Sequence, residues 1–311
     1  MLKNKKENTI LDLTAIILTY NEEIHIDRCI KSLINIVDEI IIIDSYSTDK
    51  TIQKLKKFKK VKIFKNKFIN QAKQINWALK NIKFSTKWIL RVDADEYLTK
   101  PLKDKVIIKL RSNDSDYSGI SFNRKIKFKN KEINFGITSP HKTLRIWKKN
   151  KGRCLDHWMD EQIIVNGDVI HINETLIDHN LNSFNWWKKK HINYAKREAI
   201  NFFLMSNVFN IKNENKKDLK KINSHYKNKY NKTMIYYKFP IFIRPIFLFM
   251  YSYVLKLGFL NSWQGLVFNL FQVLWYRFLV DINIYKIKKK LKSEKLQFKK
   301  VINNMYGFPK I

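Results

Sequence analysis

The chain has 311 residues, of which 45% are hydrophobic and 14% aromatic, with only 7 glycines and 5 prolines. These values exclude a globally disordered chain and a repeat array, and they suit one large α/β domain with an appendage or two modest domains. The formal net charge of +34 favours an anionic partner such as nucleic acid, anionic lipid or a phosphorylated substrate, although a general enrichment in Lys, Asn and Ile explains part of it.

Two features of the sequence concern the compartment. Residues 1–13 are polar and charged and lack the apolar core of a secretory signal, so we expect the N-terminal part to stay in the cytoplasm. Cys29 and Cys154 form neither a metal-type pair nor a disulfide framework, which fits a reducing compartment.

Strand-like and helix-like segments alternate between residues 14 and 92. Residues 14–19 (TAIILT) and 39–44 (EIIIID) are short apolar runs typical of buried parallel strands. Further strands are expected at 61–64 and 87–92, and helices at 22–36, 47–58 and 71–82. This alternation predicts a parallel sheet with helices on both faces.

Polar side chains gather where three of the four predicted strands end. Residues 19–22 (TYNE) follow the first strand, residues 44–49 (DSYSTD) the second, and residues 93–96 (DADE) the fourth. Ligands of parallel sheets bind beyond the carboxyl ends of the strands. Helix caps and turns favour the same residue types, but three clusters at one sheet edge favour a binding site.

The middle of the chain predicts a helix at residues 102–110 and two antiparallel strands at 117–128 and 142–147. Residues 158–161 (WMDE) read as a polar-aromatic turn, and 163–165 and 169–172 are expected to pair as a hairpin around residues 166–168 (NGD). A strong helix is expected at 185–207, and a lysine- and asparagine-rich helix or coil at 214–232.

Residues 239–282 are aromatic and apolar with sparse charge. The longest uncharged run, 257–276, is long enough to span a bilayer, but asparagine, glutamine, serine and glycine interrupt it. We therefore expect amphipathic helices that lie in the membrane interface, with a single span or a soluble helical bundle as alternatives. The basic residues between 286 and 300 suit contact with anionic lipid.

The pair Asp93 and Asp95, placed directly after a strand, is the most telling motif. Two carboxylates at this spacing can share one Mg²⁺ or Mn²⁺ with a diphosphate, because both ions prefer oxygen ligands and keep positions open for phosphate. Asp44, Asn21 and Glu22 can accept hydrogen bonds from a nucleobase or ribose. The sequence contains neither GxGxxG nor GxxxxGK[ST], so no dinucleotide site of the Rossmann type and no P-loop is indicated.

Four segments in combination resemble the successive motifs of family 2 glycosyltransferases: residues 17–22 (ILTYNE), 44–51 (DSYSTDKT), 74–78 (QINWA) and 92–96 (VDADE). The resemblance implies a GT-A fold, a nucleotide-sugar donor (above all a UDP-sugar), Mg²⁺ or Mn²⁺, and inversion at the anomeric carbon. We accordingly expect a GT-A catalytic domain at residues 1–182, a helical extension at 183–232 and a membrane-associating helical region at 233–311. The implied donor-binding residues are Thr19, Tyr20, Asn21, Glu22, Asp44, Ser47, Gln74, Asn76 and Asp93, and the implied metal ligands are Asp95 and Asp93.

A second set of motifs is similar to a bacterial subgroup of that family that assembles surface polysaccharide and lipopolysaccharide. The set comprises residues 158–161 (WMDE), Asp178 with Asn180 and Leu181, residues 186–198, residues 258–261 (GFLN) and residues 275–281 (WYRFLVD). Gln162 departs from the pattern, which has histidine at this place. The candidates for binding an acceptor or its phosphate are Trp158, Lys190, His191 and Arg197, although an exposed helix face explains Lys190, His191 and Arg197 equally well. Trp186 and Trp187 could stack on a sugar ring, but packing is the more common role of such residues on an amphipathic helix.

Inversion in one step needs a general base that takes the proton of the acceptor hydroxyl. In the family this base comes from a late acidic motif, and Asp160–Glu161 is the pair that matches it. We favour Glu161 as the base; a shift of the motif by one residue would select Asp160 instead.

The sequence therefore predicts a metal-assisted inverting glycosyltransferase with a glycan or lipid-linked acceptor. We expect it at the cytoplasmic side of the membrane, peripheral or monotopic, against an anionic lipid surface and without nucleic acid. One alternative is a non-catalytic basic protein that binds membrane or nucleic acid, but this does not explain the acidic clusters at the strand ends. Another is a nucleotidyltransferase with a similar core, which usually carries a glycine-rich basic loop near its N-terminus, and this chain has none.

Overall fold

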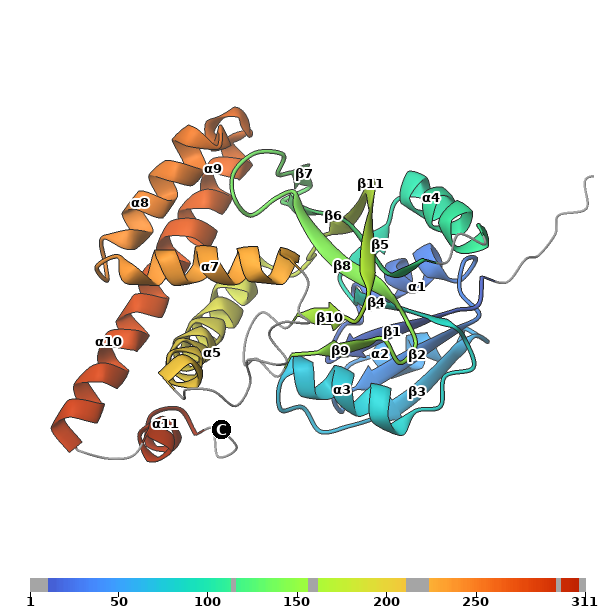
Figure 1. Ribbon diagram of the computed structural model, residues 1–311, viewed down its shortest axis with the longest axis horizontal. Coiled ribbons are helices and arrows are strands. Elements are labelled where there is room, and N and C mark those ends of the chain that lie inside the picture. Colours follow the sequence, from blue (N-terminus) through green and yellow to red (C-terminus); the bar gives the residue numbers. More distant parts are fainter. Residues whose placement is uncertain (1–10, 113–115, 156–161, 211–223, 295–297, 308–311) are drawn as a thin grey trace, which may run out of the picture.

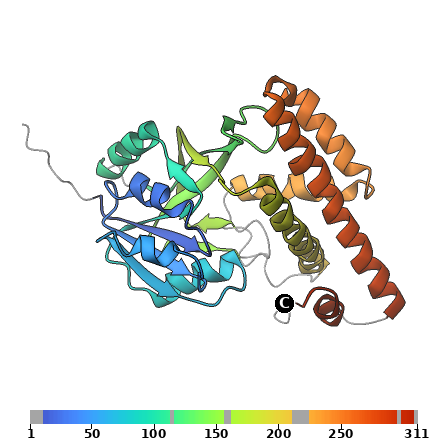
Figure 2. The same cartoon turned by 180° about the vertical axis from the view of Figure 1, so that it is seen from behind.

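The structure, a computed structural model, describes residues 11–112, 116–155, 162–210, 224–294 and 298–307. An α/β part and a helical part lie side by side (Figure 1), and the view from behind shows the same division (Figure 2). The α/β part contains the sheet and helices α1–α4, and the helical part begins with α5.

The sheet is built around β1 (Leu13–Thr19), which pairs in parallel with β2 (Glu39–Asp44) on one side and β4 (Trp88–Asp93) on the other. β3 (Val61–Lys65) extends it in parallel beyond β2. Beyond β4 follow β8 (His141–Lys148), β6 (Tyr117–Phe128), β11 (Asp168–Asp178) and the short β5 (Glu96–Leu98). β6 and β11 are parallel, whereas β4–β8, β8–β6 and β11–β5 are antiparallel. The short β7 (Lys131–Glu132) pairs with the end of β6.

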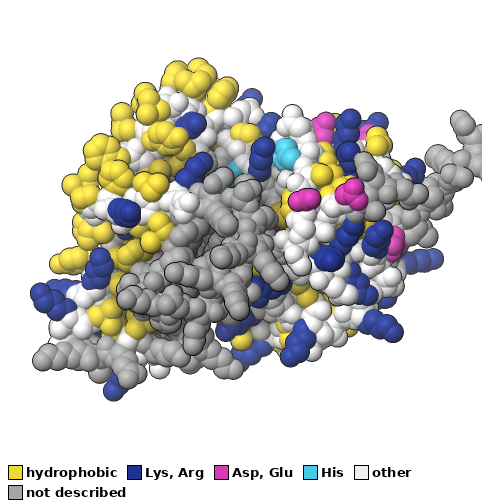
Figure 3. All heavy atoms as spheres, viewed as in Figure 1, with side chains coloured by type: hydrophobic (Ala, Val, Ile, Leu, Met, Phe, Trp, Pro, Cys, Tyr) yellow, Lys and Arg dark blue, Asp and Glu magenta, His cyan; other side chains and the backbone are white. Residues whose placement is uncertain are grey.

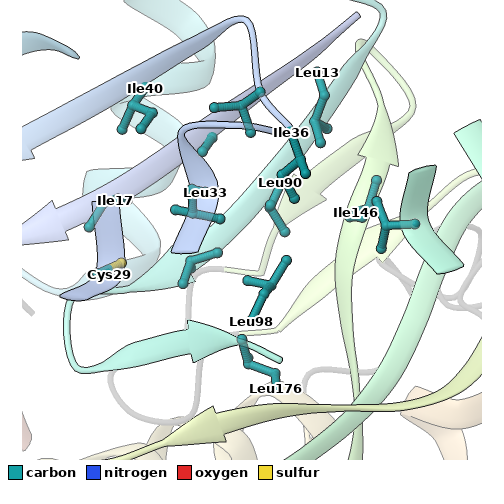
Figure 4. Close-up of a cluster of buried hydrophobic side chains, with 14 of the residues drawn as sticks. Leu13, Ile17, Cys29, Leu33, Ile36, Ile40, Leu90, Leu98, Ile146 and Leu176 are labelled. Carbon is teal, nitrogen blue, oxygen red and sulfur yellow. The ribbon is translucent and has the colours of Figure 1, made fainter. Parts of the chain in front are cut away.

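Helices and a small hairpin cover both faces of this sheet. α1 (Ile26–Leu33), α2 (Thr51–Leu55) and α4 (Lys100–Arg111) pack on one face, where Figure 4 shows the buried cluster around Leu33 and Leu90. α3 (Gln71–Asn81) packs on the other, together with β9 (Gly152–Cys154) and β10 (Ile163–Val165). Ile40 and Ile42 enter the first core and Ile41 and Ile43 the second, because alternate side chains of a strand point to opposite faces. An isoleucine run thus suits a strand that is buried on both sides.

The predicted α/β class with a mainly parallel N-terminal half is confirmed. The predicted strands lie within about one residue of the expected ranges, except the one expected at 169–172, which runs on to Asp178 as β11. The predicted hairpin of residues 163–165 and 169–172 is wrong. β10 pairs with β9, whereas β11 leaves it and pairs with β6 and β5. Gly167 makes this departure possible: its φ is +117°, and a Cβ there would approach Ser118 Oγ to 2.5 Å.

The helical part comprises α5 (Phe184–Asn210), α7 (Ser224–Lys238), α8 (Arg244–Met250), η1 (Tyr251–Leu255), η2 (Gly258–Leu260), α9 (Trp263–Asn269), η3 (Leu270–Trp275), α10 (Tyr276–Glu294) and α11 (Phe298–Tyr306). α5 and α10 share a core that contains Ala195, Ala199, Val280 and Ile284. Within the described ranges one helix, Trp263–Ser293, is long and apolar enough to cross a membrane by length and composition, and 39% of its most apolar window is buried inside the protein.

The two parts are joined through the loop between β7 and β8. Asn261 Oδ1 accepts hydrogen bonds from the backbone N–H groups of Asn134 (2.9 Å) and Phe135 (3.2 Å). Ser252 Oγ accepts one from Ile137 N at 3.2 Å, and Gly136 N donates to the Lys256 carbonyl at 3.0 Å. Side chains and a carbonyl of the helical part therefore satisfy a whole run of loop backbone groups.

A buried ion pair lies inside the helical part. Arg244 and Asp281 are almost completely buried, and Arg244 Nε donates to Asp281 Oδ1 at 2.9 Å while Nη2 contacts the same oxygen. Asp281 Oδ2 accepts a further hydrogen bond from Phe242 N at 2.8 Å. The pair thereby fixes the start of α8 on α10.

We predict that Asp281→Ala lowers the free energy of unfolding by about 3–5 kcal/mol, because it leaves the buried Arg244 guanidinium without its counter-charge. Removing both charges, in Arg244→Met with Asp281→Leu, should recover much of this loss. The measurement is urea unfolding followed by circular dichroism, with the exposed Asp104→Ala as control. Equal stability of Asp281→Ala and the control would contradict the prediction.

Candidate active site

The three predicted polar clusters meet at one edge of the sheet. Thr19, at the end of β1, is in register with Asp44 at the end of β2, and Leu18 is in register with Asp93 at the end of β4. The loops that follow these strands therefore lie next to each other, as expected for a site at the carboxyl ends of parallel strands.

Asp44 connects the loops after β1 and β2. It is fully buried, and its Oδ1 accepts hydrogen bonds from Thr19 Oγ1 (3.0 Å) and Ser47 Oγ (2.5 Å), while Oδ2 accepts one from Ser47 N (2.9 Å). Asn21, which has a φ of +56°, donates its N–H to Ser47 Oγ at 3.0 Å and accepts from Thr48 N at 2.8 Å. Asp44 and Ser47 thus hold the loops together, and their direct contact with a nucleotide stays a prediction.

Two tyrosines stand exposed on these loops. Tyr20 is 58% exposed and Tyr46 is 54% exposed, the latter on a backbone with a φ of +63°. Lys65, at the end of β3, places its Nζ 5.8 Å from the centre of the Tyr46 ring. The loops offer aromatic rings at the mouth of the site, where a base could stack.

Gln74 and Asn76, both predicted to bind the donor, make hydrogen bonds within the protein. Gln74 is buried and donates to Ser45 Oγ (2.9 Å) and to the Asn66 carbonyl (3.0 Å). Asn76 donates to the Cys154 carbonyl at 2.8 Å and accepts from Cys154 N at 3.0 Å. Gln74 therefore orients the loop after β2, and Asn76 attaches α3 to β9. A contact of either residue with a donor stays a prediction.

Asp93, the first carboxylate of the acidic pair, is engaged by two arginines. Its Oδ1 accepts from Arg91 Nη2 at 2.8 Å and its Oδ2 from Arg145 Nη2 at 3.3 Å, with 24% of the side chain exposed. Burial favours the neutral acid, but Arg91, Arg145 and Arg124 outweigh it and hold the pKa of Asp93 well below its usual range. Asp93 is thus an ionised group whose two oxygens are already occupied.

A buried charge network continues behind Asp93. Glu96 is fully buried, and its Oε1 accepts from Arg145 Nη2 (2.5 Å) and Arg124 Nε (2.8 Å), while Arg124 Nη2 also contacts Asp178 Oδ2. Burial raises the pKa of both Glu96 and Asp178, against the pull of the arginines. These residues stand on β5, β6, β8 and β11, so the network spans the sheet beneath the acidic pair.

Asp95, the second carboxylate, is better suited to a metal ion. Its Oδ2 accepts from Asn180 Nδ2 at 3.0 Å, and its Oδ1 has no partner within the described ranges. In those ranges no group of three or more His, Cys, Asp or Glu side chains could hold an ion. The residues therefore fit an ion that is held by Asp95, with Asp93 beside it, and completes its oxygen shell from a bound diphosphate.

Lys190 brings positive charge to this edge from α5. Its ammonium lies 4.7 Å from the Trp186 ring centre. Burial would lower its pKa, but Tyr194, Asp95 and Glu22 outweigh burial and raise the pKa above its usual range. The Lys190 ammonium thus interacts electrostatically with Asp95 and Glu22, and its contact with a phosphate stays a prediction. Arg197, on the same helix, stacks 5.3 Å from the ring of Phe68 in the loop after β3.

His191 has a different environment. It is buried, its ring centre lies 3.6 Å from that of Trp187, and its Nδ1 is 2.9 Å from the Trp187 carbonyl oxygen. Burial, together with the charge of Lys190, lowers its pKa to about 4, so the ring is neutral at neutral pH. The alternative of an exposed helix face is therefore wrong for His191, and its contacts favour packing against Trp187 over binding of a phosphate.

Trp158, Asp160 and Glu161 lie outside the described residues, so their predicted roles stay predictions. Sequence reasoning missed His25, Arg28 and the arginines of the charge network as parts of the site. Arg28 donates to the carbonyls of Asp95 (3.0 Å) and His179 (2.5 Å). The motif of Asp178 and Asn180 was noted in the sequence, but nothing in it indicated a contact with Asp95.

Residues 14–160 match the family described as Glycosyl transferase family 2. An uncharacterized glycosyltransferase of Rickettsia bellii is 36% identical over 104 residues, which are 33% of this chain and 34% of the relative. An uncharacterized glycosyltransferase of Haemophilus influenzae is 33% identical over 144 residues, covering 44% and 43%. The structure of S. aureus TarS 1-349 in complex with UDP-GlcNAc aligns over 91% of this chain and 92% of that one, with 14% identity and a TM-score of 0.45.

The chain spans about a third to two fifths of the length of these two curated relatives. Residues 14–160, slightly less than half of the chain, are thus similar to glycosyltransferase family 2, and the predicted GT-A type of α/β fold is confirmed. The match covers β1 to β9, which includes both the loops around Asp44 and the acidic pair.

We predict that Asp95→Ala removes the gain in UDP affinity that Mn²⁺ confers, since the ion loses the carboxylate with an unoccupied oxygen. The loss should exceed the about 10–100-fold that removal of an outer-shell partner costs. Calorimetric titration of UDP with and without Mn²⁺ measures it. Thermal unfolding without metal should be unchanged, whereas Asp93→Asn, which unbalances Arg91 and Arg145, should unfold at a lower temperature. Mn²⁺-dependent UDP binding by Asp95→Ala at the parent level would exclude the site.

Proposed function

We propose that the chain is an inverting glycosyltransferase that transfers a sugar from a UDP-sugar to an acceptor hydroxyl at a membrane surface. One observation carries the proposal: the acidic pair lies beside the loops of Asp44 and Asn21, at the carboxyl edge of parallel strands in a region similar to glycosyltransferase family 2. A non-catalytic basic protein would have no use for a pair of carboxylates at this edge, with Asp95 held in place by Asn180.

The residues around the edge divide the task of holding the donor. The exposed Tyr20 and Tyr46 can stack on the base, on loops that Asp44 and Asn21 hold rigid. Lys190 can bind a phosphate of the donor, because it stays charged while partly withdrawn from water. Such pre-ordered groups spend little binding energy on their own rearrangement.

Asp95, with Asp93 beside it, would hold Mg²⁺ or Mn²⁺. When bound, such an ion acts as a Lewis acid that stabilises the charge developing on a leaving diphosphate. Arg91 and Arg145 keep Asp93 ionised in the absence of a metal ion, and Asn180 donates a hydrogen bond to one oxygen of Asp95. The protein thus maintains two carboxylates close together before any donor arrives.

Transfer with inversion requires a base on the side opposite to the leaving diphosphate. We assign this role to Glu161, with Asp160 as the alternative. The carboxylate takes the proton of the acceptor hydroxyl while that oxygen forms the bond to the anomeric carbon, and the bond from this carbon to the diphosphate breaks. The proton ends on the carboxylate and the electron pair of the broken bond on the diphosphate.

The second part of the proposal concerns the membrane. Large apolar side chains are exposed along α7 to α9, and Figure 3 shows them gathered over α8 and α9 at one end of the molecule. They include Phe247, Met250, Leu255, Phe259, Leu260 and Trp263. An exposed apolar surface of this kind marks an interaction site in a monomer. We name it the apolar cap (residues 242–263).

Charges near the apolar cap suit an anionic bilayer. Lys129 lies 5.0 Å from the ring centre of Trp263, and Lys256 lies 5.7 Å from that of Tyr251. Further along α10, Lys286, Lys288 and Lys289 are exposed. Lysines beside aromatic rings are typical of segments that lie in the interface between lipid and water. An acceptor carried by a lipid would then reach the donor site from the same membrane, so we propose a glycan with a lipid anchor as the acceptor.

We predict that Glu161→Gln keeps the affinity for UDP and Mn²⁺ but loses sugar transfer by about 10²–10⁴, the usual contribution of a general base. Asp160→Asn should have the smaller effect. UDP release from UDP-sugars with acceptor extract, compared with UDP titration, separates the two roles. Loss of UDP binding in Glu161→Gln would assign the residue to the donor site, and near-parental transfer in both variants would remove the pair from the mechanism.

We predict that the full chain sediments with vesicles of phosphatidylcholine and phosphatidylglycerol, and that Phe247→Glu with Leu255→Glu weakens this binding at least about 10-fold. Burial of a single large apolar side chain is worth about 1.5–3 kcal/mol. The two side chains are 62% and 71% exposed, and Ile108→Glu on α4, 59% exposed in the α/β part, is the matched control. Parental binding by the double variant would show that the apolar cap does not contact lipid.

A further inference from the structure

Residues 179–182, which we call the linker segment, follow β11 and precede α5. They form hydrogen bonds to the turn after β4 and to His25 and Arg28, which follow β1. His179 N donates to the Asp95 carbonyl at 3.0 Å, and Arg28 donates to the carbonyls of both Asp95 and His179. The backbone of the linker segment is therefore fixed to the turn that carries the acidic pair.

His25 fixes the linker segment to the loop after β1. It is fully buried, and its Nε2 is 2.8 Å from Leu181 N. Because the N–H of Leu181 is a donor, Nε2 must accept, and the ring proton stands on Nδ1. Nδ1 then donates to Glu22 Oε2 at 2.6 Å. The loop that contains Glu22 and the linker segment are thus joined through one imidazole of defined tautomer.

The amide of Asn180 has a defined orientation. Asn182 N donates to Asn180 Oδ1 at 3.0 Å, so the oxygen faces the linker segment's own backbone and the NH₂ group faces away from it. That NH₂ group donates to Asp95 Oδ2 at 3.0 Å. Asn180 therefore holds Oδ2 of Asp95, and among the residues that the structure describes nothing binds Oδ1, which leaves that oxygen for an ion.

We propose that Asn180 is the positioning residue for the metal-binding carboxylate, and that the linker segment keeps it there through His25 and Arg28. The inference rests on the proposed metal-dependent donor binding. Partners that orient a metal-ligating carboxylate contribute about 10–100-fold to metal affinity. The linker segment continues directly into α5, so it also fixes where Lys190 stands relative to Asp95.

The test is calorimetric titration of UDP into Asn180→Ala, with and without Mn²⁺. We expect the Mn²⁺-dependent gain in UDP affinity to fall by about 10–100-fold, while metal-free UDP binding and the unfolding temperature without metal stay at the parental values. Asn182→Ala is the matched control, because it removes the same kind of side chain two residues later and leaves the backbone N–H that binds Asn180. It should behave like the parent.

A second variant separates positioning from folding. Asn180→Ser retains an oxygen for the N–H of Asn182 but is too short to reach Asp95, so it should lose the Mn²⁺ effect to the same extent as Asn180→Ala. A parental Mn²⁺ effect in Asn180→Ser would overturn the proposal, as would an equal loss of metal-free UDP binding. If the parent itself showed no Mn²⁺-dependent gain in UDP affinity, the proposed metal site would be wrong. If the parent showed this gain and the Asn180 variants retained it in full, the metal site would stand and the positioning role of Asn180 would be wrong.

Discussion

The site depends on the placement of charged groups inside the sheet. Removing a carboxylate or a guanidinium from water costs several kcal/mol, and the cost is tolerable only when opposite charges and hydrogen bonds compensate it. Glu96 has no exposure to solvent, so Arg124 and Arg145 must lie where they do, and Arg145 extends the same network to Asp93. Because the partners come from four strands, the relative position of these strands fixes the position of the acidic pair. The turn that carries Asp93 and Asp95 is thus held in place by this network before any ligand binds.

This charge network is connected to the loops after β1 and β2 on one side and to the helical part on the other. Towards the donor loops the connection runs through backbone pairing of β1 with β2 and β4, and then through the side chain of Asp44. Towards the helical part it runs from Asp95 to the linker segment and into α5, whose core with α10 is apolar. The connections through strand pairing, Asp44 and Asn180 are hydrogen bonds, whereas α5 and α10 are joined by apolar packing. Apolar packing alone would leave the donor loops and the linker segment free to shift relative to one another.

Much of this arrangement could be predicted from sequence, and the part that could not has physical causes. The isoleucine runs of β1 and β2 specify buried strands, and the polar residues after them specify the edge at which a ligand binds. The pairing of β10 with residues 169–172 was predicted wrongly, because residues 166–168 (NGD) have the same turn sequence whether or not the strands on either side of them pair with each other. Histidine is a residue type that can bind phosphate, so the sequence alone made His191 a candidate. The structure shows that it stacks on Trp187 and that burial lowers its pKa. Contacts such as Arg124 with Glu96 join residues 28 positions apart, and no local pattern encodes them.

The joint between the two parts has an evolutionary consequence. Asn261 and Ser252 accept hydrogen bonds from the backbone N–H groups of Asn134, Phe135 and Ile137. These hydrogen bonds do not depend on the side chains at the three loop positions. Among residues 134–137, Gly136 has a φ of +106° and is restricted by its backbone. Positions 134, 135 and 137 can therefore change without loss of these hydrogen bonds, whereas the helical part must conserve its two polar side chains. Drift in the loop gives the chain a tolerant surface on which new specificities can arise while the architecture stays constant.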